Sequence, residues 1–349
     1  MSLKRTIINQ GLRAIEATRA DIWLGPLAQG RGVILMMHHV RPPRESAFAP
    51  NGLLEITPEF LDLTISLVKE MGFDFIPMDD VGRRLNATQD RPFAVLTFDD
   101  GYRDNAEYAL PVLRRHSVPA ILYVTTAFAD GEGRLWWLEL EEAIARLDRI
   151  VFHHDGRDFD LTAHSAQEKQ RAFDAVYWRL RSGNEEALLH VIAELAASAG
   201  VNSGQLTRRL CMDWQALAEI AKEPDIAIGA HTCTHPMLAK HDAQTVRSEL
   251  TASREQIEDR LKCAVRHLAY PVGDPTSAGP RDFGLAREAG YETAVTTRPG
   301  HVFQAHRDHM HALPRVSVNG LHQNRTTMRS LLSGVPFLAW NRGRRVNVD

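Results

Sequence analysis

Short apolar runs alternate with helical patterns from residue 31 almost to the end of the chain, and this alternation constrains the fold most. Each run has the length and apolar content of a buried strand. Strands that alternate with helices are typical of a parallel sheet, and over this length they favour one parallel α/β barrel over two separate domains. The expected strands are residues 32–37, 73–78, 93–98, 118–124, 225–230, 265–270, 293–297 and 312–318.

Helical patterns fill the gaps between several of these strands. One helix is expected over residues 57–70, where Thr57 can cap it and Pro58 occupies its first turn. A second is expected over residues 242–262, which carry apolar residues on one face. Residues 136–210 interrupt the alternation, because they are rich in helical signals and lack clear strands. We therefore expect a helical insertion there, which either walls a substrate cleft or serves only as scaffold.

The sequence divides into three segments. We predict an N-terminal helical lead-in over residues 1–30, a barrel over residues 31–335 that includes the insertion, and a C-terminal tail over residues 336–349. Apolar residues recur at helical spacing in the lead-in, which predicts a helix packed on the barrel. The alternative is peripheral contact of residues 1–28 with a membrane surface, although such a helix would prefer a more basic polar face.

Composition and charge argue against several classes of protein. The chain has 349 residues, 44% of them apolar, and a formal net charge of −3, without the basic excess of a nucleic-acid binder. No run approaches the roughly 20 apolar residues that a membrane span requires. No secretory signal peptide is evident, and three cysteines without a CxxC pair suggest a reducing compartment. We therefore expect a cytoplasmic location.

Two adjacent carboxylates, Asp99 and Asp100, follow the apolar strand over residues 93–98, and Gly101 comes next. In a parallel α/β barrel, catalytic groups collect at the carboxyl ends of the strands. Neighbouring carboxylates repel each other, and a bound dication relieves this by neutralising one and leaving the other free to accept a proton. A solvated turn at the end of a strand is the alternative interpretation of these residues.

Two histidines, His231 and His235, follow the strand over residues 225–230. On a helical turn this spacing puts both rings on one side, where they can share a metal ion. One carboxylate and two imidazoles make a site of three ligands with positions left for water and substrate, whereas a structural zinc site normally has four protein ligands. The combination predicts metal-assisted hydrolysis.

These two motifs resemble those of the polysaccharide deacetylase family, also called the NodB-homology family or family 4 carbohydrate esterases. The family motif TFDDG corresponds to residues 97–101, and the motif H-[ST]-x-x-H corresponds to residues 231–235. The resemblance extends over roughly residues 31–320. It implies a distorted (β/α)7 barrel, with the insertion and the N-terminal helix as additions.

The resemblance also implies a role for each residue of the motifs. Asp99 would be the general base, and Asp100, His231 and His235 would hold a divalent metal ion, typically Zn²⁺. The backbone N–H of Tyr102 would help to hold the oxyanion. The expected activity is removal of an N-acetyl group from an amino-sugar-containing carbohydrate, in a polymer, an oligosaccharide or a lipid-linked sugar.

A third motif departs from the common family pattern RxPYG. Residues 268–273 have Ala269 where that arginine would fall, and they resemble the branch with a YPxG motif, which includes exopolysaccharide deacetylases acting on poly-N-acetylglucosamine. The missing arginine leaves the orientation of Asp99 open, and Arg315 is our hypothesis for its substitute. The residues expected near the substrate are Tyr270, Pro271 and Arg315. An apolar wall for a sugar ring, or simple packing, is expected of Tyr270, Trp136 and Trp137.

The same branch has an LMYHxV element whose histidine is the general acid. Residues 35–40 resemble this element, with His38 in place of that histidine and Met37 in place of the tyrosine. A histidine suits proton transfer because its pKa lies near the working pH. The neighbouring His39 is the second candidate, and a histidine that merely closes the first strand is the alternative.

Two other functions remain open at the level of sequence. The same scaffold can deformylate an amino sugar or hydrolyse another non-peptide amide. The chain can also be a pseudoenzyme that binds carbohydrate without turnover, although the intact Asp99 argues against this because a binding module has no need of a base.

Overall fold

The computed structural model describes residues 3–87 and 90–348. All eight predicted strands are present, although several are shorter than expected; the second has only two residues. The strands of the main sheet are β1 (Gly32–Met37), β4 (Asp74–Phe75), β5 (Phe93–Phe98), β6 (Ala120–Val124), β9 (Ile226–Ala230), β10 (His267–Ala269), β11 (Thr293–Pro299) and β12 (Leu313–Ser317). A separate short pair consists of β2 (His39–Val40) and β3 (Glu55–Ile56).

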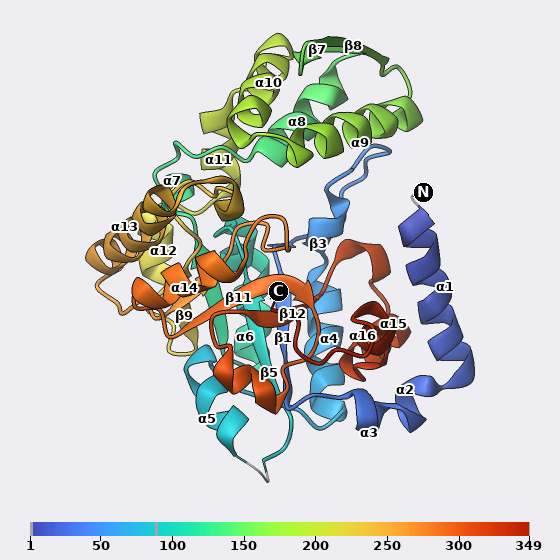
Figure 1. Cartoon of the computed structure of the whole chain (residues 1–349), viewed down its shortest axis with the longest axis vertical. Helices are drawn as coiled ribbons and strands as arrows, with labels where there is room; N and C mark the ends of the chain where they lie inside the picture. Colours follow the sequence, from blue (N-terminus) through green and yellow to red (C-terminus); the bar gives the residue numbers. More distant parts are fainter. Residues whose placement is uncertain (1–2, 88–89, 349) are drawn as a thin grey trace.

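Seven of these strands close into a parallel barrel (Figure 1). Their order is β1-β12-β11-β10-β9-β6-β5, and β1 pairs with β5 along its whole length to close the ring. Strand β4 lies outside the ring, because it pairs with Phe93 and Ala94 at the start of β5, whereas β6 pairs with β5 from Leu96 onward. The closed ring of seven parallel strands with surrounding helices confirms the predicted barrel.

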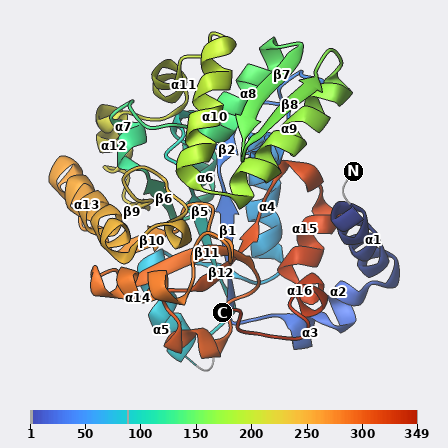
Figure 2. The same ribbon diagram turned by 45° about the horizontal axis from the view of Figure 1, so that its top comes forward.

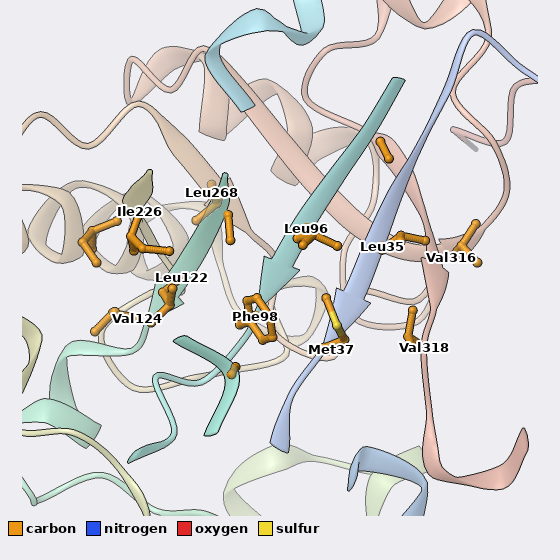
Figure 3. Close-up of a cluster of buried hydrophobic side chains, with 14 of the residues drawn as sticks. Leu35, Met37, Leu96, Phe98, Leu122, Val124, Ile226, Leu268, Val316 and Val318 are labelled. Carbon is orange, nitrogen blue, oxygen red and sulfur yellow. The ribbon is translucent and has the colours of Figure 1, made fainter. Parts of the chain in front are cut away.

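Helices cover the outside of the barrel. They are α4 (Pro58–Glu70), α6 (Leu110–His116), α12 (Trp214–Ile220), α13 (Ala243–Leu261), α14 (Pro280–Glu288) and α15 (Arg325–Leu332), whereas α5 (Val81–Asn86) packs Val81 and Leu85 against the interior side chains of the barrel. Thr57 caps α4 as predicted, since its side chain accepts a hydrogen bond of 3.1 Å from the backbone N–H of Phe60. The largest hydrophobic cluster lies between the helices and the strands, and Figure 3 shows its strand residues Leu35 and Leu96. The same cluster includes Leu250 of α13.

The interior of the barrel is filled by a second set of strand residues. Successive strand residues point to opposite sides of the barrel wall. In β5, Leu96 belongs to the outer cluster, whereas Val95 belongs to a separate cluster with Ile34 and Tyr123 of the neighbouring strands. By the same alternation Asp99, the first residue after β5, points into the barrel at the carboxyl ends of the strands, where catalytic groups collect in such barrels.

Residues 136–210 form a lobe above the barrel (Figures 1 and 2). After the short helix α7 (Thr126–Ala129), the lobe contains α8 (Trp136–Arg146), β7 (Arg149–His154), β8 (Arg157–Thr162), α9 (Ala166–Ser182), α10 (Glu185–Ser198) and α11 (Ser203–Leu210). The prediction that this segment lacks strands is wrong, because β7 and β8 form an antiparallel hairpin. Its turn residues Asp155 and Gly156 have φ angles of +51° and +71°, and Asp-Gly is a common sequence of such hairpin turns.

Helices also flank both ends of the barrel sequence. Three precede it, α1 (Leu3–Thr18), α2 (Ala20–Trp23) and α3 (Gly25–Ala28), and α1 packs beside α15 and α16 (Val335–Trp340), as Figure 1 shows. The predicted start of the tail at residue 336 therefore falls within a helix. Residues 1–2 and 349 of the predicted end segments lie outside the described residues. Within the described ranges, no helix is long and apolar enough to cross a membrane.

Candidate active site

The carboxyl end of β5 turns sharply at the two adjacent carboxylates. The backbone N–H of Asp99 donates a hydrogen bond of 3.0 Å to the carbonyl of Met37, which keeps Asp99 in register with β1. Asp100 then adopts a φ of +72°, and Gly101 one of +66°. A left-handed conformation at a residue with a Cβ costs on the order of 1–3 kcal/mol, and surrounding structure must enforce it. Both carboxylates are buried, each 2% exposed.

The two histidines follow β9 in a loop. The predicted helical turn is wrong, because Thr232 has a φ of +66° and His235 one of +62°. The side chain of Thr232 accepts a hydrogen bond of 3.1 Å from the backbone N–H of His235, which closes the loop. The two imidazole rings nevertheless lie together, with centroids 4.9 Å apart. The spacing therefore brings the rings into contact through a different backbone path.

Asp100, His231 and His235 converge on one point. Oδ1 of Asp100 lies 3.4 Å from Nε2 of each histidine, and the three groups offer ligand atoms within 4.8 Å of one another. Tetrahedral ligands about 2.1 Å from a zinc ion lie about 3.4 Å apart. Among the described residues, Oδ1 of Asp100 is buried without a hydrogen-bond partner. A buried, unsatisfied carboxylate oxygen that faces two imidazoles fits a divalent cation.

Neighbouring groups hold both imidazoles in place. Nδ1 of His231 lies 2.7 Å from the carbonyl oxygen of Ala269, to which it donates, so that Nε2 faces Asp100. The ring of His235 packs against Trp137, with centroids 4.9 Å apart. Burial by itself would raise the pKa of Asp100, but the two histidines hold it well below its ordinary value. The carboxylate is therefore ionised, as metal coordination requires.

Arg315 of β12 pairs with Asp99 across the inside of the barrel. Its two terminal nitrogens lie 2.8 and 2.7 Å from the two carboxylate oxygens, and it also donates to Thr97 Oγ1 at 3.1 Å and to the Thr296 carbonyl at 2.8 Å. Both side chains of the pair are at most 2% exposed. Burial alone would raise the pKa of Asp99, but the charge and hydrogen bonds of Arg315 lower it. Asp99 is therefore an oriented, ionised carboxylate.

His38 and His39 have different surroundings. His38 follows β1 and lines the same cleft as Asp100; burial lowers its pKa, and the charge of Asp100 partly opposes this. His39 lies away from the cleft, with Nδ1 2.6 Å from Oδ2 of Asp104 and its ring stacked on Tyr102 at 3.5 Å between centroids. His38 is therefore the better placed of the two for proton transfer to a substrate.

Tyr102 lies directly after the turn that carries the carboxylates. Its side chain is buried in the core of the insertion, and burial raises the pKa of the phenol well above its ordinary value, so that the ring is neutral. Next to it, the backbone N–H of Met212 donates to the carbonyl of Gly101 at 3.0 Å. The acceptor is the carbonyl of Gly101, so this hydrogen bond does not involve the backbone N–H of Tyr102.

A cleft of about 350 Å³ lies between the barrel and the insertion. On the barrel side it is lined by His38, Asp99, Asp100, His231 and His235. On the insertion side the lining is aromatic and consists of Trp136, Trp137, Phe173, Tyr177 and Trp178. The remaining lining residues are Met36, Pro50, Asn51, Leu53, Leu54, Asp174, Arg181, Val272, Asp274 and Thr297. The insertion is therefore one wall of the cleft, and Trp136 and Trp137 belong to that wall.

Three residues expected near the substrate lie outside the described lining of the cleft. Tyr270 is buried in the outer core, where its ring packs on Phe283 and its hydroxyl donates to the carbonyl of His311 at 2.9 Å. Pro271 also lies outside the lining, and Arg315 is engaged with Asp99 below it. The third motif contributes the Ala269 carbonyl and core packing, which agrees with the packing alternative for Tyr270, and direct substrate contact by the three residues stays a prediction.

Five cleft residues of α9 were not expected from the sequence. They are Phe173, Asp174, Tyr177, Trp178 and Arg181. Their spacing of three and four residues is the signal of one helix face. Any half-buried helix has the same pattern, so the local sequence does not indicate that this face is turned toward the barrel.

The fold and the site together define a hydrolase of the (β/α)7 barrel class, with a candidate metal site at the carboxyl ends of the strands. The chain matches the polysaccharide deacetylase family over residues 86–294, which is more than half of its length. It therefore belongs to this family, as its motifs predict, and is a carbohydrate deacetylase, a hydrolase of carbon–nitrogen bonds. No curated protein sequence matches the chain.

Solved structures share the fold at low sequence identity. A deacetylase, PplD, from Streptococcus pyogenes is 18% identical with a TM-score of 0.55, over 83% of this chain and 92% of that one. A de-N-acetylase from Aggregatibacter actinomycetemcomitans is 12% identical with a TM-score of 0.54, over 86% and 99%. IcaB from Ammonifex degensii is 14% identical with a TM-score of 0.51, over 88% and 97%. At these identities the likeness concerns the fold.

Proposed function

We propose that the protein is a metal-dependent deacetylase that removes the N-acetyl group from an amino sugar within a poly- or oligosaccharide. The observation that carries this proposal is the buried pair of Asp99 and Arg315 beside the converging side chains of the metal site. A module that only bound carbohydrate would not require an oriented, ionised carboxylate next to three metal ligands. The likeness in fold to a protein described as a de-N-acetylase supports an N-acetyl substrate.

Asp100, His231 and His235 would hold the cation, and we propose Zn²⁺ because this mixed imidazole and carboxylate set is common in catalytic zinc sites. When bound, the cation polarises the acetyl carbonyl and lowers the pKa of water. Nδ1 of His231 donates to the Ala269 carbonyl, which leaves Nε2 of this ring to bind the cation. The ring of His235 is positioned by its loop and by its contact with Trp137.

The protein's own groups carry the proton transfers. Asp99 accepts the proton of the attacking water. Arg315 hydrogen-bonds to one lone pair on each oxygen of the Asp99 carboxylate, and because each oxygen has a second lone pair, the carboxylate can still accept that proton. The backbone N–H of Tyr102 donates to the oxyanion that develops on the acetyl oxygen. His38 donates a proton to the amine nitrogen as the carbon–nitrogen bond breaks, so that the products are acetate and a free amino sugar.

The test is acetate release from N-acetylglucosamine oligomers by protein stripped with a chelator and then reloaded with Zn²⁺. We expect release after reloading, little release from stripped protein, and a loss of about 100- to 10,000-fold in Asp99→Asn. Asp259→Asn, the same substitution on an exposed residue of α13, serves as the control and should retain full activity.

Metal content measured on every sample separates the possible failures. If the wild type binds one equivalent of metal and releases no acetate from any oligomer, the deacetylase proposal is wrong. Release of formate from an N-formyl sugar would then favour the deformylase alternative, and binding of the oligomer without any release would favour the pseudoenzyme.

Two further proposals concern location. The cytoplasmic location stays a prediction, and cell fractionation tests it. Peripheral contact of residues 1–28 with a membrane also stays a prediction, and the exposure of Ile22, Trp23 and Leu27, at 50%, 61% and 66%, supports it. Co-sedimentation with anionic lipid vesicles, which should be lost in Trp23→Ala, tests the contact.

A further inference from the structure

The cleft contains two large apolar side chains that remain exposed. Trp178 on α9 is 60% exposed and Leu53 is 42% exposed, and both line the cleft that holds the candidate catalytic groups. Apolar side chains of this size are usually buried, and apolar surface in a cleft often marks a binding site. What bears on a ligand is that both side chains line one concave cleft, because apolar surface in such a cleft is what ligands cover.

Trp178 belongs to a single face of α9 that is turned toward the cleft. Asp174, Tyr177, Trp178 and Arg181 follow one another at helical spacing and all line the cleft. The opposite face of the helix is anchored, because Val176 and Leu180 are fully buried in the core of the insertion. The four side chains are thus presented by a rigid element, as a preformed binding surface requires.

Arg181 ties this face to the other wall of the cleft. Its guanidinium lies 2.5 Å from Oδ2 of Asp274, which follows the third motif, and its central carbon lies 5.3 Å from the centre of the Trp178 ring. Tyr177 packs edge-on against Trp178, with centroids 5.0 Å apart. The indole is therefore held by two neighbours, and it still keeps more than half of its surface exposed.

We propose that this face of α9 is a second sugar-binding subsite, which holds a neighbouring residue of the polymer while an N-acetyl sugar occupies the catalytic groups. The proposal rests on the proposed function for the class of sugar. A pyranose ring has an apolar C–H face that packs on an indole and a rim of hydroxyls that hydrogen-bond to a carboxylate such as Asp174. The subsite makes the substrate an oligomer or polymer of hexosamine rather than a single sugar.

The test measures binding without turnover, in the Asp99→Asn background. The affinity of an N-acetylglucosamine pentamer is determined by calorimetry for this variant alone, with Trp178→Ala added, and with Trp23→Ala added. Trp23 is the matched control, because it is 61% exposed, as Trp178 is at 60%, and lies on α2, outside the cleft lining. We expect Trp178→Ala to weaken binding about tenfold and Trp23→Ala to leave it unchanged.

Two results would overturn the subsite. One is equal affinity of the pentamer for all three proteins, and the other is absence of pentamer binding to folded Asp99→Asn. Acetate release by the wild type decides the proposed function separately. If the pentamer binds through Trp178 but the wild type releases no acetate, the subsite proposal stands and the deacetylase proposal is wrong.

Discussion

The barrel and the insertion each form one side of the cleft, and they hold their side chains by different means. On the barrel side, buried polar contacts fix each group: Arg315 holds Asp99 through two hydrogen bonds, and a backbone carbonyl holds His231. On the insertion side, aromatic rings rest on an apolar core of their own. Charges that take part in a reaction need fixed positions and protonation states, whereas recognition of a sugar needs shape and apolar surface.

Glu185 joins the insertion to the barrel loop that carries His235, in addition to the ion pair of Arg181 with Asp274. Glu185, at the start of α10 in the insertion, is 5% exposed, and it accepts the backbone N–H of Met237 at 3.0 and 3.1 Å and contacts His241 at 2.7 Å. Met237 lies two residues after His235. The insertion therefore also braces the loop that carries one of the candidate metal ligands.

The largest effect is expected on the barrel side, in Arg315→Met. This substitution leaves the carboxylate of Asp99 buried without its partner, and we expect it to lower the free energy of unfolding by about 3–5 kcal/mol. Chemical denaturation measures the loss. Adding Asp99→Asn, which removes the unpaired charge, should restore a large part of it, and a double variant no more stable than the single one would contradict the role of the pair.

Substitution of one buried leucine in each region compares the core of the insertion with that of the barrel. Leu188 of the insertion and Leu250 of the barrel are both fully buried, but they belong to different clusters. Each substitution by alanine should cost about 2–5 kcal/mol locally. Hydrogen exchange should show lost protection in α8 to α10 for Leu188→Ala and in α13 and β9 for Leu250→Ala. Equal loss throughout both regions in either variant would mean that the cores unfold as one unit.

Glu185→Gln tests the contact that crosses between the regions. Loss of the charge weakens the hydrogen bonds that hold the loop after His235, and such outer contacts typically change metal affinity by about 10- to 100-fold. We expect a loss near the lower limit, measured by competition with a chelating dye. Glu186→Gln, the neighbouring residue of the same helix, is the control. Unchanged affinity in Glu185→Gln would show that the barrel alone holds the metal ligands.

The smallest effect is expected for Arg181→Met, which removes the ion pair with Asp274 across the cleft. Partly exposed ion pairs contribute on the order of 1 kcal/mol or less. We expect KM for an oligomer to rise about two- to fivefold with kcat unchanged, because the catalytic groups of the barrel are not touched. A comparable fall in kcat would show that this wall positions the reacting groups.

Local sequence patterns were sufficient to predict the elements whose formation depends on residues that are close together in the chain. The apolar runs predicted all eight strands of the main sheet, and Thr57 caps its helix. The two motifs stand at strand ends, and parallel strands bring those ends to one edge of the barrel. The Asp155-Gly156 turn between alternating runs was also a usable hairpin signal, and it was masked by the helical signals around it.

The sequence by itself therefore determined the barrel, its family and the three residues that converge on the candidate metal site, because strand periodicity and strand-end motifs are local. The sequence offered Arg315 only as a hypothesis and left two alternatives for Tyr270; tertiary structure decided that Arg315 reaches Asp99 across β1 and that Tyr270 lies in the core. Tertiary structure alone decided that one face of α9 becomes a wall of the cleft. Arg315 and Asp99 are separated by 216 residues, and only barrel closure brings them together. Which face of an amphipathic helix meets a cleft is likewise set by packing between distant elements, and no local pattern carries that information.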